Sequence, residues 1–137
     1  MIKFTYLVKR RSDLSQAAFE ERWQGPHSAA VEAAAAALKL EAYSRCKRLT
    51  TPLEACLAAS RGGAEPAFDG VIELWWPSLE VYQDMIGTPE GRAAMRAVID
   101  TERRFVDLER SQAFFTEVEA TAVAGAAVRP SLGVSHP

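Results

Sequence analysis

The sequence predicts a single α+β domain, in which four antiparallel strands form one sheet and helices cover one of its faces. Short segments with alternating apolar and polar residues, typical of strands, are separated by segments with helix caps and helical spacing. Their order is strand, helix, strand, strand, helix, strand, which is that of the ferredoxin-like fold. We expect this domain to cover residues 1–119 and residues 120–137 to form a C-terminal tail.

The first strand is expected at residues 2–9, where apolar and polar side chains partly alternate. Ser15 can cap the next helix, because its hydroxyl can accept a hydrogen bond from an amide of the first turn. Phe19 and Trp23 are four residues apart, so they lie on one face of this helix. The helix is expected to continue to about residue 24.

Gly25, Pro26 and His27 are expected to separate this helix from the next one. Gly25 suits the left-handed residue that ends a helix, and Pro26 suits the first position of a new helix, where no N–H is needed. His27 would then lie in the first turn of a helix of residues 26–38, at the positive end of its dipole. This position favours the neutral imidazole and predicts that His27 acts as a base.

The rest of the chain supplies the remaining elements. Strands are expected at residues 39–49, 71–76 and 109–119, a connection at 50–68, and helices that begin at Ser78 and at Thr88-Pro89. The helix after Pro89 extends to about residue 107. Five of six residues on one of its faces are apolar, as core packing requires, and the sixth is Glu102.

The third strand predicts a cover for the second face of the sheet. Ile72, Leu74 and Trp76 point to one side of this strand, and Val71 and Trp75 point to the other. A sheet with helices on one side only would normally expose its second face to water. We therefore expect a second copy of the chain to cover this face, giving a two-fold dimer in which two sheets form an α+β barrel. The alternative is a tryptophan that stays half exposed at the strand end.

Composition excludes several classes of function. The net charge of −2, without a basic stripe that carries aromatic residues, argues against nucleic acid as a partner. No apolar segment reaches the roughly 18 residues of a membrane span, and the first residues do not form a signal peptide. Cys46 and Cys56 lack the spacing of a zinc site, so we expect reduced thiols, a cytoplasmic protein and no metal. Two histidines leave a haem ligand open.

Three segments carry a resemblance to a known family. They are YLVKRRSDLSQAAFEERWQGPHSAAV, FDGVIELWWPSLEVYQDMIGTPEG and DTERRFVDLERSQAFFTEVE. Together with the residues between them, these segments resemble EthD-like proteins of the dimeric α+β barrel superfamily over residues 2–119. The resemblance implies a ferredoxin-like subunit and a homodimer. It also implies that His27 occupies the position of the histidine that enzymes of the family are thought to use.

The candidate catalytic residues are His27, Glu73 and Tyr6. His27 is the expected base, and the alternative is a structural histidine bonded to a backbone carbonyl. Glu73 is a lone carboxylate in an apolar strand, which suits a perturbed acid in a pocket or a salt bridge to Arg45 or Lys47. The Tyr6 hydroxyl could orient a phenol or carbonyl oxygen of a substrate.

Five aromatic residues are expected to wall an apolar pocket between the sheet and the helices, although core packing would also explain them. They are Trp23, Tyr43, Trp75, Tyr82 and Phe115. With the resemblance, they indicate an acid–base enzyme without cofactor, of cyclase, decarboxylase, dehydratase or isomerase type, that acts on a small aromatic or polyketide-like molecule. The alternatives are a non-catalytic ligand-binding or accessory protein and a small monooxygenase, cofactor-free or haem-dependent.

Overall fold

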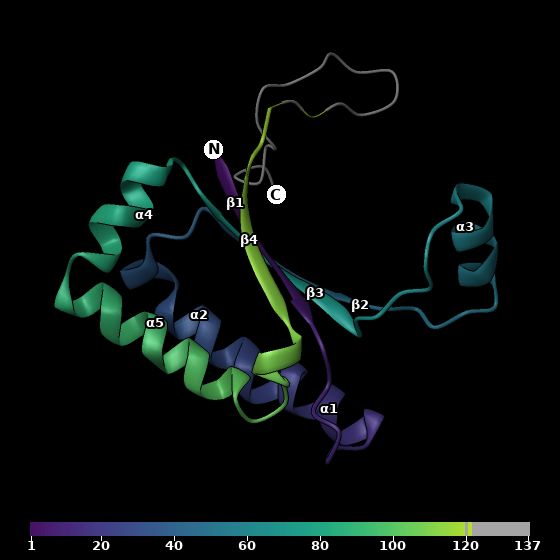
Figure 1. Cartoon of the computed structure of the whole chain (residues 1–137). Helices are drawn as coiled ribbons and strands as arrows, with labels where there is room; N and C mark the ends of the chain where they lie inside the picture. Colours follow the sequence, from purple (N-terminus) through teal and green to yellow (C-terminus); the bar gives the residue numbers. More distant parts are fainter. Residues whose placement is uncertain (120, 122–137) are drawn as a thin grey trace.

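The computed structural model describes residues 1–119 and 121, which contain a four-stranded antiparallel sheet with a layer of helices on one face (Figure 1). The strands are β1 (Ile2–Val8), β2 (Ala42–Lys47), β3 (Gly70–Trp76) and β4 (Gln112–Glu117). They lie in the order β2-β3-β1-β4, and each neighbouring pair is antiparallel. The predicted ferredoxin-like arrangement is therefore confirmed. The predicted tail lies outside the described residues, apart from Thr121.

The helices are α1 (Gln16–Arg22), α2 (Ser28–Leu38), α3 (Leu53–Arg61), α4 (Leu79–Ile86) and α5 (Pro89–Glu102). Helices α2, α4 and α5 lie on one side of the sheet, whereas α3 projects to the other side from the connection between β2 and β3 (Figure 1). Ser15, Ser78 and Thr88 accept hydrogen bonds from amides in the first turns of α1, α4 and α5, so the predicted caps are confirmed. No helix in the described part of the chain is long and apolar enough to cross a membrane.

The predicted helix break at Gly25 and Pro26 is wrong. A π-helical turn, Trp23–His27, joins α1 directly to α2, and Gly25 does not have a positive φ. Pro26 explains the wide turn, because it has no N–H to donate and its ring would clash with a carbonyl four residues earlier in an α-helix. Ser28 closes the turn, since its N–H and its hydroxyl both donate to the carbonyl oxygen of Trp23.

Two strands are shorter than predicted. α2 ends at Leu38 and is followed by Lys39, whose φ of 56° is left-handed, so β2 begins only at Ala42. Before β4, the chain forms a short 3-10 turn, Leu108–Arg110, in which Asp107 accepts a hydrogen bond from the Arg110 N–H. In both cases a local turn replaces extended chain just before the first residue of the strand.

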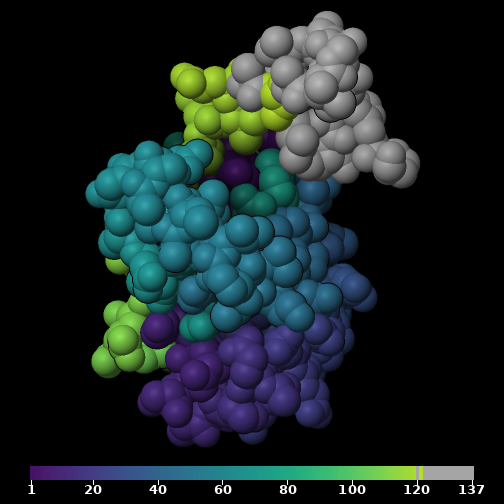
Figure 2. Space-filling view, turned by 90° about the vertical axis from the view of Figure 1, so that its right-hand side faces the viewer, coloured from purple at the N-terminus to yellow at the C-terminus, as the bar shows by residue number. Residues whose placement is uncertain are grey.

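The register of the sheet decides which side chains face the helices. Phe4 pairs with Leu74 and Phe115, and Tyr6 pairs with Ile72, so these residues share the helix-covered face. The opposite side, which we call the open face, carries Lys3, Thr5, Leu7, Ser44, Val71, Glu73, Trp75 and Phe114. Figure 2 views the molecule from the side of α3 and shows the β2–β3 connection in front of the sheet.

An aromatic cluster anchors the π-helical turn to the core. Trp23 lies against Phe19 and Phe105, with ring centroids 5.4 and 5.8 Å away. Its indole also lies against Gly70, the first residue of β3, where a Cβ atom would collide with the ring. Gly70 therefore lets helix and strand approach closely, and the turn that carries His27 is fixed by packing on both sides.

Candidate functional site

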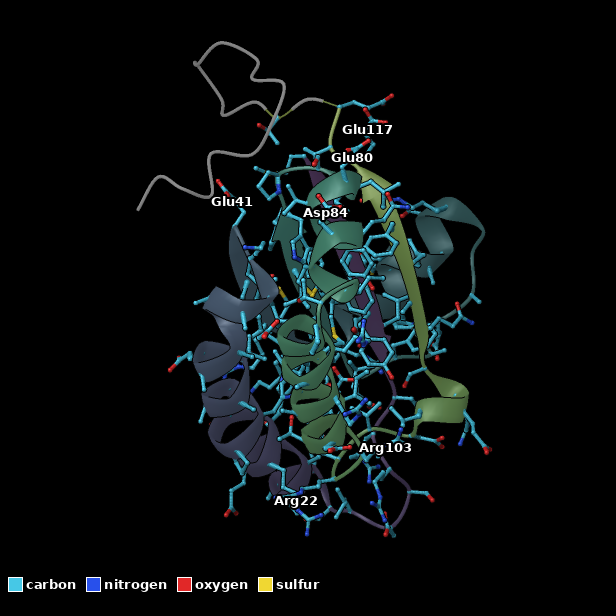
Figure 3. The ribbon with its side chains drawn as sticks, turned by 90° about the vertical axis from the view of Figure 1, so that its left-hand side faces the viewer. Arg22, Glu41, Glu80, Asp84, Arg103 and Glu117 are labelled. Carbon is cyan, nitrogen blue, oxygen red and sulfur yellow. The ribbon has the colours of Figure 1, made fainter. Side chains whose placement is uncertain are left out.

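A cavity of about 380 Å³ lies between the sheet and the helices, and residues of both α5 and β4, two elements that Figure 3 shows from the helix side, contribute to its wall. Its wall is formed by Phe4, Tyr6, Leu74, Trp76, Tyr82, Met95, Val98, Ile99, Glu102, Leu108, Ser111 and Ala113. Most of these side chains are apolar or aromatic. The polar groups that stand out are the carboxyl of Glu102 and the hydroxyls of Tyr6 and Ser111.

Glu102 is the most unusual group of the wall. It is the last residue of α5 and follows Val98 and Ile99 on the face of the helix that packs against the core, so only 8% of it is exposed. Burial raises the pKa of its carboxyl to about 7, although the charge of Arg103 partly opposes this shift. At neutral pH the carboxyl therefore exists in both protonated and ionised forms, as a group that transfers protons requires.

Tyr6 presents a phenol to the same cavity. Burial, followed by the charge of Glu102, raises the pKa of Tyr6 to about 12. The phenol thus keeps its proton at neutral pH. Ser111 is held by the backbone, because its hydroxyl donates to the Asp107 carbonyl at 2.7 Å and accepts from the Lys9 N–H at 2.9 Å.

His27 is fully buried and does not line this cavity. Its Nδ1 lies 2.8 Å from the Thr101 hydroxyl oxygen, and that hydroxyl donates its own proton to the Val98 carbonyl at 2.6 Å. Nδ1 must therefore carry the proton and donate it to Thr101. Nε2 is left as a buried acceptor without a hydrogen-bond partner in the part of the chain that the structure describes.

The imidazole of His27 is neutral, as the sequence indicated, but for a different reason. Burial, followed by the charge of Arg45, lowers the pKa of His27 to about 4. The dipole of a helix beginning at Pro26 cannot contribute as predicted, because the helical segment continues through this position. The ring packs edge-on against Phe105, and it reaches the cavity wall only through Thr101, the residue before Glu102.

Glu73 lies on the open face, so the structure does not bring it together with His27 or Tyr6. One carboxyl oxygen is 2.8 Å from the Lys3 ammonium, and the other accepts a hydrogen bond of 2.9 Å from Ser44. The expected salt bridge to Arg45 or Lys47 is wrong. Both of these residues lie opposite helix-facing positions of β3, and their side chains bind Ser28 and Glu20 instead.

The predicted aromatic residues are distributed over several sites. Tyr82 lines the cavity, and Phe115 contacts Tyr82 with ring centroids 4.9 Å apart but is not part of the wall. Trp23 belongs to the aromatic cluster, Trp75 lies on the open face, and the Tyr43 hydroxyl is 3.4 Å from that of Ser28.

Glu102, Ser111 and Thr101 are not among the site residues predicted from the sequence. A signal for Glu102 was present, since it is the one acid in an otherwise apolar stripe of its helix. Residues 1–119 and 121 contain no group of three or more His, Cys, Asp or Glu side chains that could hold a metal ion.

The fold and the site place this chain in the class of α+β proteins that hold an apolar cavity between a ferredoxin-like sheet and its helices. Within this class the chain belongs to the EthD domain family, because the family model matches residues 11–109. No match was found among curated proteins.

Solved structures agree with this fold. An ethyl tert-butyl ether D (EthD) family protein from Bacillus halodurans has a TM-score of 0.56 and 17% identity, with 85% of this chain and 97% of that chain covered. A protein from Arabidopsis thaliana has a TM-score of 0.54 and 12% identity, with 90% and 100% covered. A dimeric ferredoxin-like protein of unknown function from Thermobifida fusca has a TM-score of 0.52 and 14% identity, with 84% and 88% covered. At such identities the likeness shows the fold alone.

Proposed function

We propose that this EthD domain is a cofactor-independent enzyme that performs acid–base chemistry on a small aromatic or polyketide-like molecule in the cavity. The observation that carries the proposal is the Glu102 carboxyl, which lies on an apolar wall and has a pKa of about 7. A group with this pKa can accept a proton and return it at neutral pH. Cyclisation, dehydration and isomerisation of a carbonyl compound all include such a proton transfer.

Glu102, Tyr6 and His27 have different roles in this proposal. Glu102 exchanges the proton with the substrate, and Tyr6, which stays protonated, orients a substrate oxygen. His27, the residue to which the family resemblance points, acts as a positioning residue, because its hydrogen bond to Thr101 holds the end of α5 where Glu102 begins to face the cavity. In this proposal the base is therefore the carboxyl of Glu102, which lines the cavity, and not His27.

A non-catalytic ligand-binding or accessory protein is the second candidate. The filled core around His27 supports it, since an imidazole packed against Phe105 cannot touch a molecule in the cavity. The haem-dependent monooxygenase has less support, because Nε2 of His27 would need open space on its far side and is instead fully buried. A cofactor-free monooxygenase would use the same cavity.

We also propose that the chain forms a homodimer through its open face. Phe114 is 47% exposed there and supplies apolar surface for a second copy, whereas Trp75 on the same face is only 6% exposed in the single chain. Two structural neighbours, from Bacteroides fragilis and Thermobifida fusca, are described as dimeric.

Cys46 and Cys56 are exposed free thiols, which suits the reducing cytoplasm.

The catalytic proposal is tested by proton exchange with a simple ketone. The protein is incubated with 1-tetralone in deuterium oxide near pH 7, and incorporation of deuterium next to the carbonyl is followed by nuclear magnetic resonance. We expect exchange above the buffer rate, reduced about a hundredfold or more in the Glu102→Gln variant. Glu90→Gln, an exposed glutamate at the start of the same helix, is the matched control. Exchange no faster than in buffer, or equal in both variants, would contradict the proposal.

A further inference from the structure

The cavity has a charge pattern that restricts its ligands. None of the described residues that line it is a lysine, an arginine or a histidine. Arg103, which follows Glu102, has an exposed side chain near Asp100 and is not part of the wall, and Figure 3 places it at the lower end of α5. An anionic ligand would therefore meet no compensating cation inside the cavity, and burying it there would be costly.

The carboxyl of Glu102 is free to bind a ligand. Within the described residues, neither of its carboxyl oxygens has a hydrogen bond or an ion pair, although the residue is nearly buried. The burial of this residue removes much of the hydration of its carboxyl, and no donor among the described residues replaces it, which is costly. A ligand that brings a hydrogen-bond donor to this carboxyl would restore the lost interaction.

The surrounding groups favour an aromatic ligand with its donor at one end. Tyr6, Tyr82 and Ser111 carry the hydroxyl groups of the wall, and the proton of Ser111 is already donated to the Asp107 carbonyl. The remaining wall, which includes Phe4, Trp76 and Tyr82, offers ring faces and edges. A flat ring would thus bury its surface against aromatic groups while its polar end reaches Glu102.

We propose that the cavity binds an uncharged aromatic molecule through a hydroxyl group that donates a hydrogen bond to Glu102. A carboxylate in the same place would bring only acceptors and, beside the ionised form of Glu102, a second negative charge. An ammonium group would gain the carboxylate and the ring faces, but it would have to give up its strong hydration. A neutral hydroxyl gains a charge-assisted hydrogen bond at the smallest loss of hydration. This inference rests on the proposed function in placing the ligand in the same cavity.

Binding of four matched probes to the full chain tests the inference. They share one ring system and differ in the attached group: 1-naphthol, 1-methylnaphthalene, 1-naphthoate and 1-naphthylmethylamine. Isothermal titration calorimetry or quenching of tryptophan fluorescence gives the dissociation constants. We expect 1-naphthol to bind about ten- to a hundredfold more tightly than 1-methylnaphthalene, and 1-naphthoate to bind least.

The variants locate the interaction. Glu102→Gln should reduce the affinity for 1-naphthol about tenfold or more and leave that for 1-methylnaphthalene within about threefold, whereas Glu90→Gln should change neither. In the wild-type protein, 1-naphthol should bind more tightly as the pH rises through about 7, because the ionised carboxylate is the stronger acceptor. This pH dependence should be absent in Glu102→Gln.

Several outcomes would overturn the inference: 1-naphthoate or the amine binding more tightly than 1-naphthol, no binding of any probe, or unchanged 1-naphthol affinity in Glu102→Gln. The wild-type comparison of the four probes does not depend on how the variant folds. The outcome is separable from that of the proposed function, because the probes report binding and the exchange of 1-tetralone reports proton transfer. The predicted preference without ketone exchange would contradict the enzyme alone.

Discussion

The Nδ1 atom of His27 lies 2.8 Å from the Thr101 hydroxyl oxygen, and this hydrogen bond joins the π-helical turn to the last turn of α5. It fixes the tautomer of the imidazole, since the Thr101 proton is donated to Val98. It also links the residue that the family resemblance favoured to the neighbour of Glu102.

Removing the Thr101 hydroxyl should destabilise the protein. Thr101→Val keeps the shape of the side chain but leaves the Nδ1–H of His27 buried without an acceptor, which costs about 1–3 kcal/mol. Urea unfolding at pH 7.5 measures the change. Thr101→Ser, which retains the hydroxyl, should recover most of the loss. Equal stability of the valine variant and the wild type would show that the hydrogen bond contributes nothing.

His27 should make the protein less stable in acid. Its folded pKa of about 4 lies below the unfolded value of 6.5, so the unfolded chain binds the proton more readily. The cost begins as the pH falls through 6.5 and is complete below about 4, where it reaches about 3 kcal/mol. The difference in unfolding free energy between wild type and His27→Gln, measured from pH 7.5 to 4, should therefore shift by this amount in favour of the variant. A nuclear magnetic resonance titration that gave His27 a raised pKa would refute this prediction.

Glu102 should lower stability at the other end of the pH range. Its folded pKa of about 7 lies above the unfolded value of 4.5, so the folded state holds the proton more tightly. The cost appears as the pH rises above 4.5 and is complete above about 7, at about 3 kcal/mol. Glu102→Gln should therefore unfold at a higher urea concentration than wild type at pH 8 and show little difference at pH 4. Glu90→Gln should show no such dependence, and a stabilisation of Glu102→Gln that is equal at both pH values would argue against a raised pKa.

A charge on the open face should separate the proposed dimer. Phe114→Glu places a carboxylate at a position that is 47% exposed in one chain, so a single chain tolerates it but a packed pair of sheets does not. Light scattering should change from about 30 kDa, twice the chain mass of 15.0 kDa, to the mass of one chain. Leu79→Glu, an exposed leucine on α4 in the helix layer, should leave the mass unchanged. A wild-type protein that is already monomeric at micromolar concentration would disprove the dimer.

The fold could be predicted because its evidence is local. The alternation around Phe4 and Tyr6 and the capping residues Ser15, Ser78 and Thr88 act within a few residues of chain, and the structure confirms each of them. The prediction of a helix break was wrong because it, too, used only local evidence. Gly25-Pro26 indicates an end when it is considered by itself, yet packing of Trp23 against Phe19, Phe105 and Gly70 keeps the helical segment continuous, and a π-helical turn accommodates the proline.

The candidate site was predicted only in part. Tyr6 and Tyr82 do meet at one cavity, but the acid expected beside them was Glu73, and the structure places Glu102 there. Alternation along β3 already places Glu73 on the side of Val71 and Trp75, but that Lys3 is its partner depends on strand register. Register is a long-range property that the residues near Glu73 do not encode.

The sequence by itself determined the strand and helix order, the helix caps, the family and the presence of a histidine after the Gly-Pro pair, because each of these depends on residues close together in the chain. Only the tertiary structure decided that His27 is buried behind Thr101 and that Glu102 faces the cavity. The reason is physical: burial is set by elements that are distant in sequence, and it is burial that lowers the pKa of His27 to about 4 and raises that of Glu102 to about 7.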